Sequence, residues 1–318
     1  MLGSQDEVWS TAATAAPTVK LPHISYERPH FSQDSRYLST QEAKDLYIIR
    51  DRESGEICHR LPGGFFPIHL GPGGREIIGF SAASSRLTWW DAVDGKETKS
   101  YPCAGLADIV HPHLLLRVTP DGQSWLALDA PTRIGLHRSS DGTLIRSWTV
   151  PEMHGQIERD GHLAVSQDGA LAAWRPTGSS TIWLLRATGP PQPLVGHRMD
   201  LTRLEFSPDG QTLASSSVDH TIRLWTTASG VCQTVLPGHF EEVSDISFSP
   251  DGRSLASVAL GDSVKFWQLP LGRELMRLED ADLGRHIVFS PDGHTLAVTG
   301  DYARPYGPDR SLKLLRAP

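Results

Sequence analysis

The sequence contains few cysteines and none of the paired spacings on which zinc sites and disulfide frameworks depend. Cys58, Cys103 and Cys232 stand far apart in a chain of 318 residues, whereas such sites use spacings such as C-x-x-C. We therefore expect free thiols in a reducing compartment, and neither a bound metal nor a cofactor.

Long apolar runs and basic clusters are also missing. No stretch approaches the roughly 20 apolar residues that cross a bilayer, and residues 1–10 carry Asp6 and Glu7 where a secretory signal would be basic. The net charge of −7 disfavours contact with nucleic acid, because phosphate binding depends on many Lys and Arg side chains. We expect a cytoplasmic protein that binds neither nucleic acid nor membrane.

Recognisable catalytic and ligand-binding motifs are absent as well. His111 and His113 form a lone H-x-H pair, whereas zinc needs three or four converging ligands. The glycine-rich segments at 62–64 and 71–74 lack the Lys and Ser/Thr of a phosphate-binding loop, and no G-x-S-x-G nucleophile elbow occurs. The sequence therefore predicts no enzymatic activity.

What the chain does contain is a repeat that runs through almost all of its length. The segment Phe-Ser-Pro-Asp-Gly occurs at 206–210, 248–252 and 289–293, and four weaker copies end at positions 35, 74, 122 and 169. Successive copies lie 39 to 48 residues apart, and their Asp-Gly and Pro-Asp-Gly steps supply tight-turn chemistry. Each unit holds short stretches of period-two alternation and no sustained helical pattern. The repeat predicts an all-β fold.

Two of the units carry further landmarks. Gly-His stands at 196–197 and at 238–239, and the third strand-like stretch of these units ends in Trp225 and Trp267. This pattern resembles the WD-40 repeat, which has a period of roughly 40 to 45 residues, a Gly-His start and a Trp-Asp end. The second unit keeps the literal dipeptide, Trp90-Asp91. The remaining units place another residue at the tryptophan position: Arg50, His137, Leu185 and Leu315.

The resemblance implies a seven-bladed β-propeller of four-stranded antiparallel blades, in which each blade buries its faces against its neighbours. The last unit stops after its third strand, and residues 18–25 have no other assignment. We expect this N-terminal segment to complete the last blade and close the ring, which removes an unpaired sheet edge. Residues 1–16 are expected to be a disordered lead or junction, and 17–318 a single, monomeric propeller.

The resemblance also implies a buried hydrogen-bonded set that joins a His, a Ser, an Asp and the Trp of a blade. In the fifth unit the matching residues are His197, Ser215, Asp219 and Trp225. In the sixth they are His239, Ser257 and Trp267, with Gly261 where the Asp is expected and Asp262 one place late. We therefore expect the network of the sixth unit to be incomplete.

Loops on one face of such a ring are the expected place for function, because a rigid scaffold positions them. An insertion at 301–309 and a long connection at 151–160 contain residue types found at interface hot spots, and one further loop exposes a large apolar side chain. The candidate partner-binding residues are Tyr302, Arg304, Tyr306, Met153, Arg159 and Phe240. The alternative for each loop is a solvated connection without a partner.

The most direct interpretation is a non-catalytic scaffold that binds protein partners through these loops. The regular Ser-Pro-Asp-Gly turns look like those of bacterial WD-repeat proteins, so an alternative is the sensor or docking domain of a larger signalling protein, for example one with a Ser/Thr kinase. A propeller enzyme that uses the central channel is the third alternative, since fold does not determine function. Against it, we expect no carboxylate, His or nucleophile set to converge at equivalent positions of several repeats.

Overall fold

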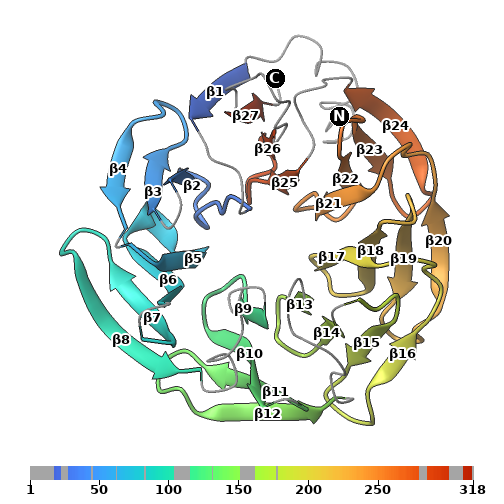
Figure 1. The fold of residues 1–318 in the computed structure, drawn as a ribbon, viewed down its shortest axis with the longest axis horizontal. Helices are drawn as coiled ribbons and strands as arrows, with labels where there is room; N and C mark the ends of the chain where they lie inside the picture. Colours follow the sequence, from blue (N-terminus) through green and yellow to red (C-terminus); the bar gives the residue numbers. More distant parts are fainter. Residues whose placement is uncertain are drawn as a thin grey trace, which may run out of the picture.

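The computed structural model describes residues 18–22, 28–43, 46–61, 63–81, 84–103, 115–130, 132–150, 162–176, 178–278, 285–300 and 311–316. These residues form seven antiparallel sheets that stand as blades around a central axis (Figure 1). Within these ranges no helix is long and apolar enough to cross a bilayer. The chain is the all-β, seven-bladed β-propeller that the repeat and the resemblance predict.

The blades follow one another along the chain. Blade 1 contains β2 (Tyr37–Ala43), β3 (Leu46–Asp51) and β4 (Ile57–Arg60), and blade 2 contains β5 (Phe65–Leu70), the 3-10 turn η1 (Pro72–Gly74), β6 (Glu76–Ser81), β7 (Arg86–Asp91) and β8 (Lys96–Pro102). Blade 3 contains β9 (Leu116–Val118), β10 (Ser124–Ala130), β11 (Arg133–Arg138) and β12 (Leu144–Thr149). Blade 4 contains β13 (His162–Val165), β14 (Ala172–Arg175), β15 (Ile182–Leu185) and β16 (Gln192–Leu194).

The last three blades have the same order of strands. Blade 5 contains β17 (Leu201–Phe206), β18 (Thr212–Ser217), β19 (Ile222–Thr226) and β20 (Cys232–Leu236). Blade 6 contains β21 (Val243–Phe248), β22 (Ser254–Ala259), β23 (Val264–Gln268) and β24 (Arg273–Leu278). Blade 7 contains β25 (His286–Phe289), β26 (Thr295–Thr299), β27 (Ser311–Arg316) and β1 (Thr18–Pro22). In blades 2 to 6 the first strand lines the centre of the ring and the fourth lies on its rim (Figure 1).

The turn after each inner strand owes its shape to the repeated motif. In blade 5 the Ser207 hydroxyl donates to the Asp209 carboxylate over 2.6 Å and accepts from the Thr212 N–H at 2.9 Å. Gly210 closes this turn with φ 69°, a left-handed conformation that side chains disfavour. Ser35 occupies the same place in blade 1 with φ 61°, so the weakest copy of the motif forms the same turn without a glycine.

Apolar side chains fill the space between adjacent blades. One buried cluster joins Leu224 and Leu236 of blade 5 to Ile246, Phe248 and Trp267 of blade 6. A single blade could not shield such a face from water, so each blade depends on the next. This packing fixes the inner strands around the axis and, with them, the connections at their ends.

Blade 1 differs from the predicted four-stranded blade. Its sheet has three strands, and an isolated bridge between Phe31 and Leu38 stands where an inner strand would be. Pro29 has no N–H with which to continue a ladder, although Ser39 still donates to the His30 carbonyl over 2.9 Å. The prediction of four full strands in every blade is therefore wrong for this one.

The ring closes through the N-terminal strand, as predicted. β1 pairs antiparallel with β27 over the whole of Thr18–Pro22, from Thr18 opposite Leu315 to Pro22 opposite Ser311. In Figure 1 the blue β1 lies beside the red β27 and completes blade 7. Residues 23–25 of the predicted closing segment, and the expected lead at 1–16, lie outside the described residues.

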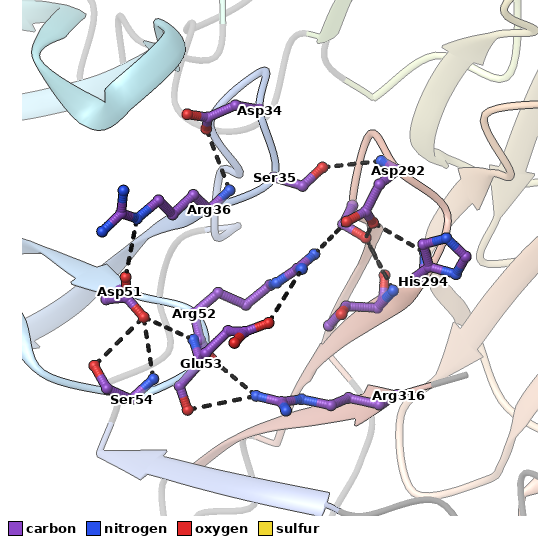
Figure 2. A network of polar contacts seen from close by, with 12 residues as sticks. Asp34, Ser35, Arg36, Asp51, Arg52, Glu53, Ser54, Asp292, His294 and Arg316 are labelled. Carbon is purple, nitrogen blue, oxygen red and sulfur yellow. Dashed lines mark hydrogen bonds and ion pairs between the residues drawn. The ribbon is translucent and has the colours of Figure 1, made fainter. Parts of the chain in front are cut away.

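Polar contacts reinforce the seam between blades 7 and 1 (Figure 2). Arg52, in the turn between β3 and β4, donates to the Asp292 carboxylate over 2.6 Å, and the Asp292 N–H donates to the Ser35 hydroxyl over 2.9 Å. Arg316 of β27 donates to the Arg52 carbonyl at 3.3 Å. The seam between the last and the first blade is thus held by side chains as well as by β1.

Candidate functional site

A chain of buried polar groups crosses blade 5. The Ser215 hydroxyl is fully buried and lies 2.8 Å from Trp225 Nε1, which donates to it, and 2.8 Å from His197 Nε2. His197 Nδ1 lies 2.9 Å from Asp219 Oδ2, and the same oxygen accepts from the Arg198 N–H at 2.9 Å. The structure therefore brings together the four side chains that the resemblance assigns to one network, and it ties them to the loop before β17.

The expectation of an incomplete network in blade 6 is wrong. His239 lies 2.8 Å from both Ser257 Oγ and Asp262 Oδ2, and Trp267 donates to the same serine over 2.8 Å. Asp262 reaches His239 from one sequence position later because the turn differs. The left-handed residue of this turn is Gly261, with φ 68°, and it precedes the aspartate. In blade 5 the left-handed residue, His220 with φ 65°, follows the aspartate instead.

The electrostatics of the blade 5 network fit a structural role. Burial would raise the pKa of Asp219, but hydrogen bonds from Thr221, the Arg198 N–H and His197 outweigh it and lower this pKa to about 2. Burial also lowers the pKa of His197, against the opposing effect of Asp219. Neutral His197 and the fully buried Ser215 have no access to a substrate, so the set positions the loop and does not form a hydrolytic triad.

Two other blades fill the same place with different chemistry. Arg50 stands at the tryptophan position of blade 1 and donates from Nε to Thr40 Oγ1 over 3.3 Å. His137 of blade 3 lies 3.0 Å from Asp129 and stacks on Trp125 with ring centroids 4.1 Å apart. The fold therefore does not require an indole at this position, and the buried Leu185 and Leu315 of blades 4 and 7 show that it does not require a hydrogen-bond donor there either.

The loops held by these networks expose apolar side chains. Phe240 is 76% exposed and Met199 is 50% exposed, although each lies within two residues of a buried histidine. The Phe240 N–H donates to Asp262 over 3.2 Å, as the Arg198 N–H does to Asp219. The exposed side chains therefore project from backbone that partly buried carboxylates hold in place.

Only one of the predicted partner-binding residues lies in the described part of the chain. Phe240 is described and lies on the surface, as the sequence predicts. The other candidates, Tyr302, Arg304, Tyr306, Met153 and Arg159, lie outside the described residues, and their role stays a prediction.

Charged side chains meet at the axis of the ring. Arg28 lies 3.0 Å from Glu205 Oε2 and 3.1 Å from Asp245 Oδ2, and Arg203 Nε lies 3.4 Å from the other oxygen of Asp245. His286 Nδ1 is 3.5 Å from Asp245. Burial would raise the pKa of Asp245, but Arg28 and Arg203 hold it well below its usual range. This half of the channel is thus a compensated ion-pair cluster.

The acidic members of the cluster also satisfy the backbone of the next blade. Asp245 accepts from the Ile287 N–H at 3.1 Å, and Glu205 accepts from the Phe248 N–H at 2.9 Å. Arg28 donates to the Ile287 carbonyl over 2.8 Å. Inner strands expose an unpaired edge to the channel, and such edge groups need partners. The cluster therefore stabilises the inner rim of blades 5 to 7.

Sequence reasoning missed this set, although a simple signature marks it. In five repeats, the residue three places before the end of the innermost segment is charged or is a histidine. These residues are Arg28, His162, Arg203, Asp245 and His286. The expectation that no carboxylate or His set converges at equivalent repeat positions is therefore wrong. Counting the register from the turn motif, instead of searching for catalytic triads, would have found these residues.

The radial sheets, the short inner strands and the His–Ser–Trp networks define the class: a seven-bladed β-propeller built from repeats. The chain is a WD40-repeat propeller, and the family model described as "WD domain, G-beta repeat" matches residues 189–226 and 230–268, which contain most of blade 5 and blade 6. The comparisons with individual proteins agree with this assignment.

Curated relatives share parts of the chain. A stretch of 116 residues is 32% identical to an uncharacterized WD repeat-containing protein of Synechocystis sp. and covers 36% of this chain and 32% of that protein. Protein HIRA of rice is 48% identical over 42 residues, 13% of this chain and 4% of that protein. The Notchless protein homolog of Arabidopsis thaliana is 34% identical over 70 residues, 22% of this chain and 13% of its own length. The matches thus span about a third of these relatives or less.

Proposed function

We propose that this propeller is a non-catalytic scaffold that binds a protein partner through the face around Phe240. WD40 propellers typically act as protein-interaction scaffolds, which supports the class of function. The observation that carries the proposal is the 76% exposure of Phe240 on a loop whose backbone is hydrogen-bonded to the partly buried Asp262.

Such a side chain has the properties of an interface anchor. A large aromatic ring that is exposed in the free protein gains roughly 1.5 to 3 kcal/mol when a partner buries it, and aromatic residues dominate binding energy at many interfaces. Because the loop is already held in place, binding does not have to order it. Met199, on the corresponding loop of blade 5, adds a second exposed apolar side chain.

The surroundings of Phe240 indicate the chemistry of the partner. Glu241 and Asp200 are exposed and Glu242 is half-buried on the same pair of connections. Complementary charge guides association and excludes wrong partners. We expect the partner to present an apolar side chain flanked by Lys or Arg.

The test places a photo-reactive benzophenone amino acid at position 240 in the source cells. The control carries the same amino acid at position 271, because Leu271 is equally exposed at 75% and lies in blade 6 on the turn between β23 and β24, at the opposite end of the strands. The proposal is supported if position 240 gives a single specific adduct and the partner in that adduct is then purified. This partner should bind Phe240→Ala at least about tenfold more weakly than the parent and should bind Leu271→Ala normally. The same adducts from both positions, or none from position 240, would overturn it.

A further inference from the structure

One arginine from outside the regular strands fills a set of acceptors at the axis of the ring. Arg28 precedes blade 1, but its guanidinium bonds to blades 5, 6 and 7. It donates to the Ile287 carbonyl from Nε at 3.1 Å and from Nη2 at 2.8 Å, and to the Ile246 carbonyl at 3.0 Å. The carboxylates of Glu205 and Asp245 lie 3.0 and 3.1 Å from it. These two carbonyls and two carboxylates form what we call the axial pocket.

The shape of the axial pocket depends on the blades and not on the arginine. The two carbonyls belong to β21 and β25, whose ladders with the neighbouring strands fix both oxygens. The Phe248 N–H donates to the Glu205 carboxylate at 2.9 Å. The Ile287 N–H donates to the Asp245 carboxylate at 3.1 Å. The acceptors should therefore stay in place without Arg28, and their arrangement suits a planar fork of N–H donors.

The segment that carries Arg28 has few backbone bonds to blade 1. Within the described residues 28–31 it forms no ladder, and an isolated bridge joins Phe31 to Leu38. The His30 N–H donates to the Ser39 hydroxyl, and the Ser39 N–H donates to the His30 carbonyl, both at 2.9 Å. A segment with so few bonds opens at a lower cost than a complete strand.

The axial pocket opens into the cavity of about 1370 Å³ at the centre of the ring. Arg28 and Glu205 line this cavity. So do Arg203 and His286, which both lie beside Asp245. A small cation that enters the cavity can therefore reach the acceptors without separating two blades. Because Arg203 and His286 already share the charge of Asp245, the pocket should select its ligand by hydrogen-bonding shape as well as by charge.

We propose that the axial pocket is a binding site for a monosubstituted guanidinium, the head group of an arginine side chain, and that Arg28 occupies it as an internal ligand. A side chain tethered in this way has an effective concentration in roughly the millimolar range, so it excludes a free guanidinium of similar or lower affinity. The segment at 28–31 is then an autoinhibitory plug, and the pocket becomes available when this segment leaves the channel. The proposal does not depend on the surface around Phe240.

The test is an NMR titration of the parent chain and of Arg28→Ala with methylguanidinium, which is the arginine head group without its stem. We expect Arg28→Ala to bind methylguanidinium at least about tenfold more tightly than the parent does. Methylammonium, a cation without the planar fork, should bind no more tightly to Arg28→Ala than to the parent.

Arg52→Ala is the matched control variant. Arg52 also donates to a carboxylate, that of Asp292 at 2.6 Å, but it lies in the outer seam between blades 7 and 1. Its removal should leave the binding of methylguanidinium as weak as in the parent. Adding Phe240→Ala to Arg28→Ala should not change the binding, so failure of this proposal and failure of the partner-binding face can be told apart.

The proposal is wrong if Arg28→Ala and the parent bind methylguanidinium equally, if neither binds it, or if Arg52→Ala gains as much as Arg28→Ala. An equal gain for methylammonium would also contradict it, because a general excess of negative charge would then explain the binding. If Arg28→Ala does not fold alone, its refolding from urea with each cation decides the question. Recovery with methylguanidinium and not with methylammonium supports the pocket, and recovery with both or with neither contradicts it.

Discussion

We expect the Ser215 hydroxyl to contribute more to the free energy of unfolding than any exposed polar group does. The substitution Ser215→Ala tests this expectation. The hydroxyl is fully buried and contacts both Trp225 Nε1 and His197 Nε2 at 2.8 Å. Alanine leaves these two buried nitrogens without their hydrogen-bond partner and adds no compensating interaction. The substitution is otherwise small, so the loss of hydrogen bonding dominates the change in stability.

The magnitude follows from the number of orphaned groups. Each buried polar group that loses its partner costs roughly 1 to 3 kcal/mol, and relaxation reduces the sum for two, so we expect Ser215→Ala to lower the free energy of unfolding by about 2 to 4 kcal/mol. In the Trp225→Phe background the indole donor is already gone. There Ser215→Ala should cost about 1 to 3 kcal/mol less, which is the coupling between the two residues.

Urea denaturation followed by far-ultraviolet circular dichroism measures all four proteins of this double-mutant cycle. The comparison is valid while the slope with denaturant stays the same among the variants. Ser229→Ala is the control, because Ser229 is an exposed serine in the same blade. If Ser215→Ala costs no more than Ser229→Ala, or if the two substitutions in the cycle are additive, the buried network does not stabilise the blade as argued.

Three further predictions concern Asp219, the turn at Ser35 and the closing strand β1. Because the folded pKa of Asp219 is lowered to about 2 from 3.8, its carboxylate stabilises the fold above about pH 4; the melting-temperature advantage of the parent over Asp219→Asn should be full there and fade as the pH falls towards 2. Ser35→Ala should cost about 1 kcal/mol more than Ser35→Gly in denaturant titrations, since both lose the bond from Asp292 and only glycine relieves the left-handed φ of 61°. A chain that begins at His23 lacks β1 and should melt lower and associate in light scattering; a monomer with the parental melting temperature would contradict the role of β1 in closure.

Much of the fold could be predicted because each repeat carries its own turn chemistry. The Ser-x-Asp-Gly segments predict where an inner strand ends, and their spacing predicts seven blades and a last blade that lacks a strand. Blade 1 was the exception, since an isolated bridge next to Pro29 stands in place of its inner strand. Counting the motifs shows how many repeats the sequence contains. It does not show how many strands of each repeat form a complete hydrogen-bonded ladder.

The candidate site was only partly predictable. The His–Ser–Trp sets could be inferred because the family resemblance supplies their spacing, but the completion of the blade 6 set by Asp262 depends on the left-handed turn at Gly261. The exposure of Phe240 could be inferred from its place after a Gly-His pair. The ion-pair cluster around Asp245 was missed because its members come from four different repeats and meet only when the ring closes.

The variation among repeats also separates what the fold requires from what it leaves open. The position two before the end of the inner strand is aliphatic and buried in blades 4 to 7, as Leu163, Leu204, Ile246 and Ile287, because it packs between blades. The position just before it faces the channel and changes from His162 to Arg203, Asp245 and His286. Packing does not demand charge there; in blades 5 to 7 the charges are compensated by one another, because Arg203 and His286 both lie beside Asp245.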